Sequence, residues 1–134
     1  MPRTATPRPP TKTPTPQYDF VLGRPPEKAP NCGTWYLSGT VYNNQSGSQR
    51  LNGVLVRVYD ASGQVLGTIV TGSDAYRPGY WEYIFPHGSA VRGDVAIVRP
   101  DGSLRSPRKS YRLTADCAGS DAVNQIVFDF VGTH

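Results

Sequence analysis

The sequence of 134 residues lacks any apolar run of 18 residues, which is the length that a membrane-spanning helix needs. Its first ten residues, MPRTATPRPP, carry positive charge but contain no apolar core segment, so they do not resemble a signal peptide. We therefore expect no membrane insertion. We also expect Met1 to be either an artificial start or a cut within a longer secreted chain, in which further domains of that chain lie upstream.

Groups that carry acid–base or metal chemistry are scarce between residues 31 and 134. This part has one glutamate, Glu82, and two histidines, His87 and His134. It has no His-x-x-x-His, Cys-x-x-Cys or Gly-x-Ser-x-Gly motif and no glycine loop that could cradle a phosphate. Four aspartates stand singly in turn-like contexts, where the side chain usually bonds the nearby backbone: Asp60, Asp74, Asp94 and Asp101. We expect no catalytic site, no metal and no cofactor, and hence no enzyme.

The net charge of +4 is concentrated in the first 30 residues, since residues 31–134 carry nine basic and eight acidic side chains. The one basic cluster in this part is RSPRK at residues 105–109, together with Arg112. Nucleic-acid-binding domains gather basic residues on one face. Because this cluster lies in an expected loop, we interpret it as a solvated loop and expect no nucleic-acid partner.

Residues 1–30 hold nine of the 13 prolines, several of them in Thr-Pro alternation. Proline lacks the backbone N–H that helices and central strands need. This segment is typical of a semi-rigid polyproline-type linker.

The remaining sequence alternates apolar and polar residues in short runs. The clearest run is GVLVRVYD at residues 53–60, in which Val54, Val56 and Val58 share one side of an extended chain. Further strands are expected at residues 35–42, 64–71, 80–85, 94–99, 110–114 and 124–130. Short strands separated by turn residues predict an all-β sandwich or small barrel. The expected fold is an antiparallel β-sandwich of about seven strands at residues 31–134, with a Pro/Thr-rich N-terminal extension at residues 1–30.

Alternation also predicts which side chains form the core. The expected core residues are Leu37, Val41, Val54, Val56, Val58, Trp81, Tyr83, Phe85, Val95, Ile97, Ile126, Phe128 and Phe130. The aromatic residues expected to face outward or to lie in loops are Trp35, Tyr36, Tyr42, Tyr59, Tyr76, Tyr80 and Tyr111.

The two cysteines stand before the first and the last strand of the expected sandwich, at Cys32 and Cys117. First and last strands often lie side by side, so the two thiols can meet. A disulfide would close a loop of more than 80 residues, which the loop-entropy model values at roughly 4 kcal/mol as an upper figure. Such a bond indicates an oxidising, extracellular compartment; the alternative is two buried free thiols in a cytosolic protein.

Three stretches share a pattern of core and turn residues: Gly-Thr-Val at residues 39–41, LNGVLV at residues 51–56 and GYWEY at residues 79–83. Together they resemble the carboxypeptidase-regulatory-like domains, which are appended to many secreted and cell-surface proteins. This resemblance implies an Ig-like or prealbumin-like sandwich. The similarity covers about residues 37–102 and departs from the pattern in a longer insertion at residues 74–78. The resemblance implies a non-catalytic spacer, accessory or adhesion module, and it assigns no site residues.

Two further interpretations stay open. Tyr76, Arg77 and Tyr80 surround the insertion and could form an aromatic platform for a sugar ring, so polysaccharide is a candidate partner. The apolar stretch QYDFVLG at residues 17–23, with Tyr18, Phe20 and Leu22 in alternation, could add a strand to a sheet edge of its own chain or of a neighbouring subunit. Addition to a neighbour would build an extracellular assembly or filament; we favour docking within the chain. A glycosylation sequon lies at Asn44.

The sequence thus predicts a secreted or cell-surface, non-enzymatic structural or accessory β-sandwich. Carbohydrate binding is the second interpretation, and assembly by strand addition is the third.

Overall fold

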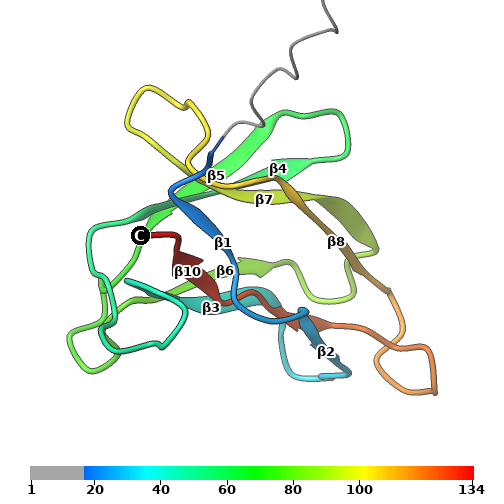
Figure 1. Ribbon diagram of the computed structural model, residues 1–134. Helices are drawn as coiled ribbons and strands as arrows, with labels where there is room; N and C mark the ends of the chain where they lie inside the picture. The colour runs from blue at the N-terminus through cyan, green and yellow to red at the C-terminus, as the bar shows by residue number, and fades with distance from the viewer. Residues whose placement is uncertain (1–16) are drawn as a thin grey trace, which may run out of the picture.

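The computed structural model describes residues 17–134, and β-strands are the only regular secondary structure in this part of the chain (Figure 1). The ten strands are β1 (Phe20–Leu22), β2 (Glu27–Ala29), β3 (Trp35–Tyr42), β4 (Leu55–Asp60), β5 (Val65–Val70), β6 (Tyr80–Phe85), β7 (Val91–Val98), β8 (Lys109–Leu113), β9 (Gln125–Val127) and β10 (Phe130–Gly132). No helix long and apolar enough to cross a membrane occurs between residues 17 and 134.

The first sheet is organised around β3. Antiparallel β6 pairs with one side of β3, and β9 and β10 run parallel to β3 on the other side. Strands β2 and β1 then pair antiparallel with β9 and β10 at the outer edge. Strands β1 and β2, which lie within the expected N-terminal extension of residues 1–30, are thus part of this sheet.

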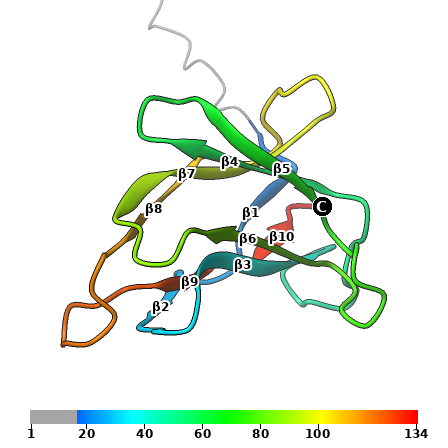
Figure 2. The same cartoon turned by 180° about the vertical axis from the view of Figure 1, so that it is seen from behind.

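The second sheet contains four antiparallel strands in the order β5-β4-β7-β8. It stacks on the first sheet to give two layers, as Figures 1 and 2 show from opposite sides. The fold is therefore an all-β sandwich, as the alternating sequence pattern predicts. It has ten strands, and the pairs that β9 and β10 make with β3 are parallel, which the expected antiparallel order did not include.

The last expected strand, residues 124–130, is divided by an irregularity at Phe128 and Asp129. An added Cβ at Gly39 of β3 would collide with the carbonyl oxygen of Phe128, so the close approach of the two backbones requires glycine there. The Asp129 carboxylate accepts the backbone N–H of Thr40 at 2.9 Å in place of a ladder partner. The strand breaks because a side chain replaces one backbone hydrogen bond.

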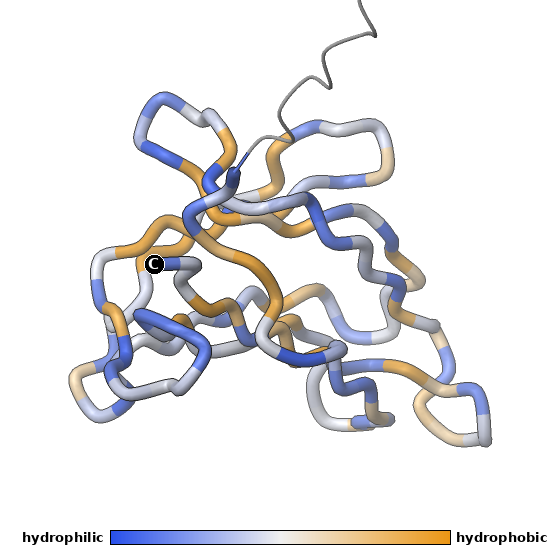
Figure 3. The backbone as a smooth tube through the Cα atoms, viewed as in Figure 1, coloured by the Kyte–Doolittle hydropathy of each residue, from blue (hydrophilic) through white to orange (hydrophobic). Residues whose placement is uncertain are grey.

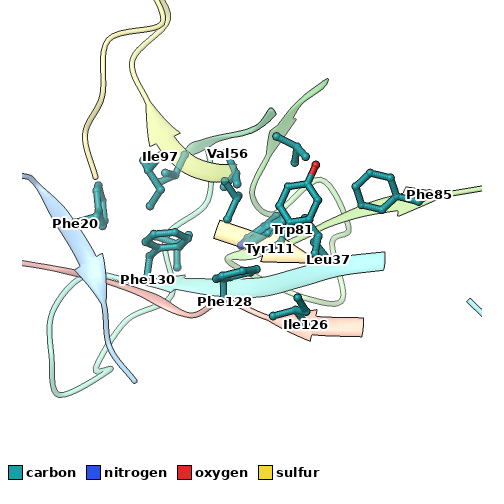
Figure 4. Close-up of a cluster of buried hydrophobic side chains, with 14 of the residues drawn as sticks. Phe20, Leu37, Val56, Trp81, Phe85, Ile97, Tyr111, Ile126, Phe128 and Phe130 are labelled. Atoms are coloured by element: carbon teal, nitrogen blue, oxygen red, sulfur yellow. The ribbon is translucent and has the colours of Figure 1, made fainter. Parts of the chain in front are cut away.

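The core lies between the two sheets and contains the predicted residues, with Tyr83 only partly buried. Large buried side chains meet there from both sheets, including Phe20, Trp81 and Phe130 from the first and Val56 and Ile97 from the second (Figure 4). In Figure 3 the hydrophobic colour runs along β1, consistent with its Phe20 entering this core.

Three aromatic residues expected to face outward are buried instead. Trp35 is 1% exposed because it shares a strand face with Leu37 and Val41. Tyr59 is covered on the outer face of its sheet by the Arg108 guanidinium, 4.2 Å from the ring centroid. Tyr111 is 3% exposed, and its hydroxyl donates to the carbonyl oxygen of Tyr59 at 2.7 Å. The outward prediction was wrong for these three.

Candidate interaction surfaces

The segment expected as a docking strand forms β1, which pairs with β10 of the same chain. Phe20 is 4% exposed and belongs to the core, whereas Tyr18 and Leu22 are partly buried. The Phe20 N–H donates to the carbonyl oxygen of Arg105, in the loop that follows β7. Strand β1 therefore contacts both layers of the sandwich.

An ionic contact holds the beginning of β1. The Asp19 carboxylate accepts a hydrogen bond from Arg105 Nε at 3.0 Å and lies 3.4 Å from Arg99 Nη2. The hydrogen bond from Arg105 is the main cause that lowers the pKa of Asp19 below its ordinary value of 3.8. Arg105 also lies over the ring of Phe20, 4.9 Å from its centroid.

A second ionic contact holds the bend between β1 and β2. Arg24 donates through Nε and Nη2 to Asp129 Oδ2, at 3.0 and 2.6 Å. These bonds raise the pKa of Arg24 above its ordinary value. Because Asp129 also accepts the Thr40 N–H, one carboxylate joins the N-terminal segment, β3 and the break between β9 and β10.

The disulfide Cys32–Cys117 ends the N-terminal segment and confirms the predicted pairing, with 4.9 Å between the Cα atoms. Beside it, Asn124 is fully buried. Its Oδ1 accepts the N–H of Asn31 at 2.9 Å, and its Nδ2 donates to the carbonyl oxygens of Thr114 and Asp116 at 3.1 and 3.0 Å. This amide joins the two loops that the disulfide connects, and no local feature of the sequence indicates it.

Of the residues expected to bind a sugar, Tyr76 and Arg77 lie in the loop before β6 and Tyr80 begins β6. They do not form a stacked platform. Tyr76 is 95% exposed. Arg77 donates to Asp74 Oδ2 at 2.8 Å and lies over the Tyr80 ring, 4.0 Å from its centroid, so one face of that ring is covered. The Tyr80 hydroxyl donates to Glu82 at 3.0 Å. Tyr76 is the ring of this loop left open to a ligand, and its binding role stays a prediction.

A groove of about 580 Å³ opens between the two sheets at the end formed by the β4–β5 and β6–β7 turns. Its lining is mainly apolar and includes Leu66, Tyr83, Phe85, Pro86, Val91 and Tyr111. Burial raises the pKa of Tyr111 to about 12, so this phenol is neutral at physiological pH. Sequence reasoning missed the groove because it assigned Tyr111 an outward position; the shared alternation of Tyr111 and Leu113 along β8 was the available signal.

The basic cluster at residues 105–112 is used partly within the molecule. Arg105 binds Asp19, Arg108 covers Tyr59, and Ser106 is buried. Among residues 17–134, no group of three or more His, Cys, Asp or Glu side chains could hold a metal ion.

The pairing of the strands and the disulfide define the chain as a β-sandwich domain. No family model and no curated protein sequence matches it. One solved structure that resembles it is the crystal structure of BcpA, the major pilin subunit of Bacillus cereus, at 13% identity over 75% of this chain with a TM-score of 0.45. The match spans 30% of that pilin chain.

Proposed function

We propose that the chain is a non-catalytic extracellular module with a structural or accessory role, in which a β-sandwich is firmly joined to the Thr/Pro-rich segment that precedes it. The observation that carries this proposal is the anchoring of residues 18–32. This short segment contributes two strands to a sheet, buries Phe20, makes two ionic contacts and ends in a disulfide. Such a junction supports a role in holding the sandwich at a fixed position relative to the segment or domain that precedes it.

The disulfide supports an extracellular location, since such bonds persist in oxidising compartments. The resemblance to carboxypeptidase-regulatory-like domains supports an accessory role. Two glycines of that pattern meet structural demands here: Gly39 permits the approach of Phe128, and Gly79 has a φ of 72°. In this proposal residues 1–30 are the linker with its docking strand and residues 31–134 are the sandwich. The partners are other domains of a longer chain or neighbouring subunits.

The anchored junction is tested by hydrogen exchange of the full chain. We expect the amides of Phe20 and Val21 to exchange about as slowly as those at the middle of β3, because all belong to one cooperative sheet. If the amides of Phe20 and Val21 exchange at the rate of an unstructured peptide, residues 18–32 are not anchored to the sandwich and the proposal loses its support.

Carbohydrate binding is the second candidate, favoured by the exposed ring of Tyr76. The test is retention of the full chain on a panel of insoluble polysaccharides, with Tyr76→Ala as the variant. Ile84→Ala serves as the control because it removes another exposed apolar side chain. The structural proposal expects no retention. Retention of the native chain and the control that is lost in Tyr76→Ala would place carbohydrate binding first.

Exchange of β1 between copies is the third candidate. It is favoured by the short strand and by the Gly23 to Pro26 bend that follows it. Deleting residues 1–24 would also remove Phe20 from the core. A change in oligomeric size could then not be separated from a loss of stability. A cleaner test is dilution of the intact chain: an exchanged dimer dissociates slowly because Phe20 must leave its core, whereas docking within the chain gives no slowly dissociating dimer.

A further inference from the structure

The sandwich has four lateral edges, formed by β5 and β8 in one sheet and by β6 and the β1–β2 segment in the other. An edge strand presents unpaired backbone N–H and C=O groups to any extended chain nearby. Natural proteins usually protect such edges with charged side chains, prolines or very short strands.

Three of these edges carry such protection. Strand β8 contains Lys109 and Arg112, and β6 contains Glu82. Strands β1 and β2 have three residues each, are separated by a bend with two prolines, and include Glu27 and Lys28.

The fourth edge, β5, has no charged residue, no proline and six residues, and its one irregularity is the register shift against β4 at Val58 and Tyr59. Its sequence is VLGTIV, and the flanking Gln64 and Thr71 are also uncharged. Val65, Leu66 and Val70 are 50%, 41% and 44% exposed. The inner side of the strand is closed, because an added Cβ at Gly67 would lie 2.8 Å from the Tyr83 ring. What β5 leaves open is its lateral edge and its outer face (Figure 2).

The direction of the free backbone groups follows from Thr71. Its N–H donates to Val54 and its C=O accepts from Gly53, so this residue faces β4. Because backbone groups alternate along a strand, those of Val70 and Thr68 face away from β4. The Val70 carbonyl oxygen already accepts the Ser73 hydroxyl at 2.6 Å, which leaves the N–H and the C=O of Thr68 at the middle of the open edge.

We propose that this edge binds a second copy of the same chain, by antiparallel pairing of β5 with β5 about a two-fold axis at Thr68. The two Thr68 residues would then exchange N–H to O=C hydrogen bonds, using the groups that are free. The regular part of the strand available for this pairing is residues 67–70, because the register of β5 against β4 shifts at Leu66. The exposed side chain of Val70 lies on it, beside the axis.

The absence of charge on β5 is the argument for a second copy as the occupant. Self-pairing places each residue type near its own counterpart, so β8 would bring together the cationic Lys109 and Arg112, and β6 would bring together two Glu82 carboxylates. Strand β5 itself contributes no charge; the nearest is Arg57 of β4, which donates to the Thr68 hydroxyl at 3.1 Å. The contact is limited in length by Gly72, whose N–H donates to Tyr80 of β6. One strand pair buries less than the roughly 1,200 Å² of a stable dimer, so the association is weak and becomes effective where copies are held close together.

The inference extends the structural role proposed above but is tested separately. The first measurement is sedimentation velocity of the full chain over a concentration series. We compare the native chain with Val70→Lys, which places a charge on the edge, and with Thr68→Pro, which removes the central N–H without adding charge. Ile84→Lys is the matched control, because it introduces the same charge at an exposed apolar position on β6. Circular dichroism verifies that each variant is folded.

We expect reversible dimers for the native chain and the control, and at least a tenfold weaker dimer for both edge variants. We also expect the Thr68 amide of the native chain to exchange more slowly as its concentration rises. A native chain that stays monomeric with an unprotected Thr68 amide overturns the inference while leaving the anchored junction untouched. A dimer that persists in both edge variants also overturns it, because the contact then lies elsewhere.

Discussion

At the scale of single residues, the structure depends on polar side chains that are buried where loops meet. Asn124 is the clearest case, since its amide satisfies groups on two loops beside the disulfide and has no exposed surface. A buried donor or acceptor that loses its partner costs about 1–3 kcal/mol. The Thr114 carbonyl would keep the indole N–H of Trp35 as a donor, so the loss falls on Asn31 and Asp116.

We therefore predict that Asn124→Ala lowers the free energy of unfolding by about 2–3 kcal/mol in urea titration, because two polar groups lose their partners. Gln64→Ala, at an exposed turn position, is the control and should change stability by less than about 0.5 kcal/mol. Equal effects of the two substitutions would show that the hydrogen bonds of the Asn124 side chain do not stabilise the fold.

Asp19 predicts a pH dependence. Its pKa is lowered in the folded state by Arg105, so the folded state favours the ionised carboxylate more than the unfolded state does. The stabilisation is present above the ordinary pKa of 3.8 and is lost as the pH falls through the lower folded-state pKa. We expect Asp19→Asn to be less stable than the native chain at neutral pH, and this difference to vanish once the pH has fallen below the lowered folded-state pKa of Asp19. A difference that is constant over this range would contradict the ionic role of Asp19.

At the scale of elements, β1 is a short strand whose stability comes from one core side chain. Phe20 lies in the core beside Phe130 (Figure 4), and truncating a buried phenylalanine costs about 3–5 kcal/mol. We predict a loss of this size for Phe20→Ala in urea unfolding. Val21, the half-buried next residue of β1, provides the control: Val21→Ala should cost less than about 1.5 kcal/mol. Similar small losses for both would mean that β1 does not belong to the cooperative unit.

Strands whose own sequence alternates were predictable. The bounds of β3 and β6 agree with the runs at residues 35–42 and 80–85, because period-two patterns reflect one buried face. Strand β2, Glu-Lys-Ala, could not be predicted since it has neither alternation nor β-branched residues. It is extended because β9 supplies a hydrogen-bonding partner.

The break between β9 and β10 also has no local signal. It depends on the contacts of Asp129 with Arg24 and Thr40, which lie 105 and 89 residues away in the sequence. Burial of Tyr59 likewise depends on Arg108, contributed by a distant loop. Alternation within a strand indicates its two faces, but it does not indicate which outer faces another segment covers.

At the scale of the whole molecule, the disulfide connects the entry of the sandwich to its last strands. Cys32 and Cys117 are separated by 85 residues, and most of the fold lies between them. We predict that the double substitution Cys32→Ser/Cys117→Ser lowers the free energy of unfolding by about 2–4 kcal/mol, measured in urea against the native chain with its bond intact. The native chain treated with a reductant should fall to the same value. A double variant as stable as the oxidised chain would mean that the bond adds nothing to the fold.

The antiparallel pairing of β1 with β10 brings the two ends of the described chain together, with Thr133 donating to Asp19. A pulling force applied to these ends would break the hydrogen bonds between β1 and β10 one after another, starting with the bonds nearest the ends. The load would then pass through the Cys32–Cys117 bond and bypass everything between the two cysteines. Reduction of that bond would release roughly 290 Å of further extension. Under tension the strands outside the closed loop, β1, β2, β9 and β10, thus carry the load, and the residues between the two cysteines are shielded from it while the disulfide holds.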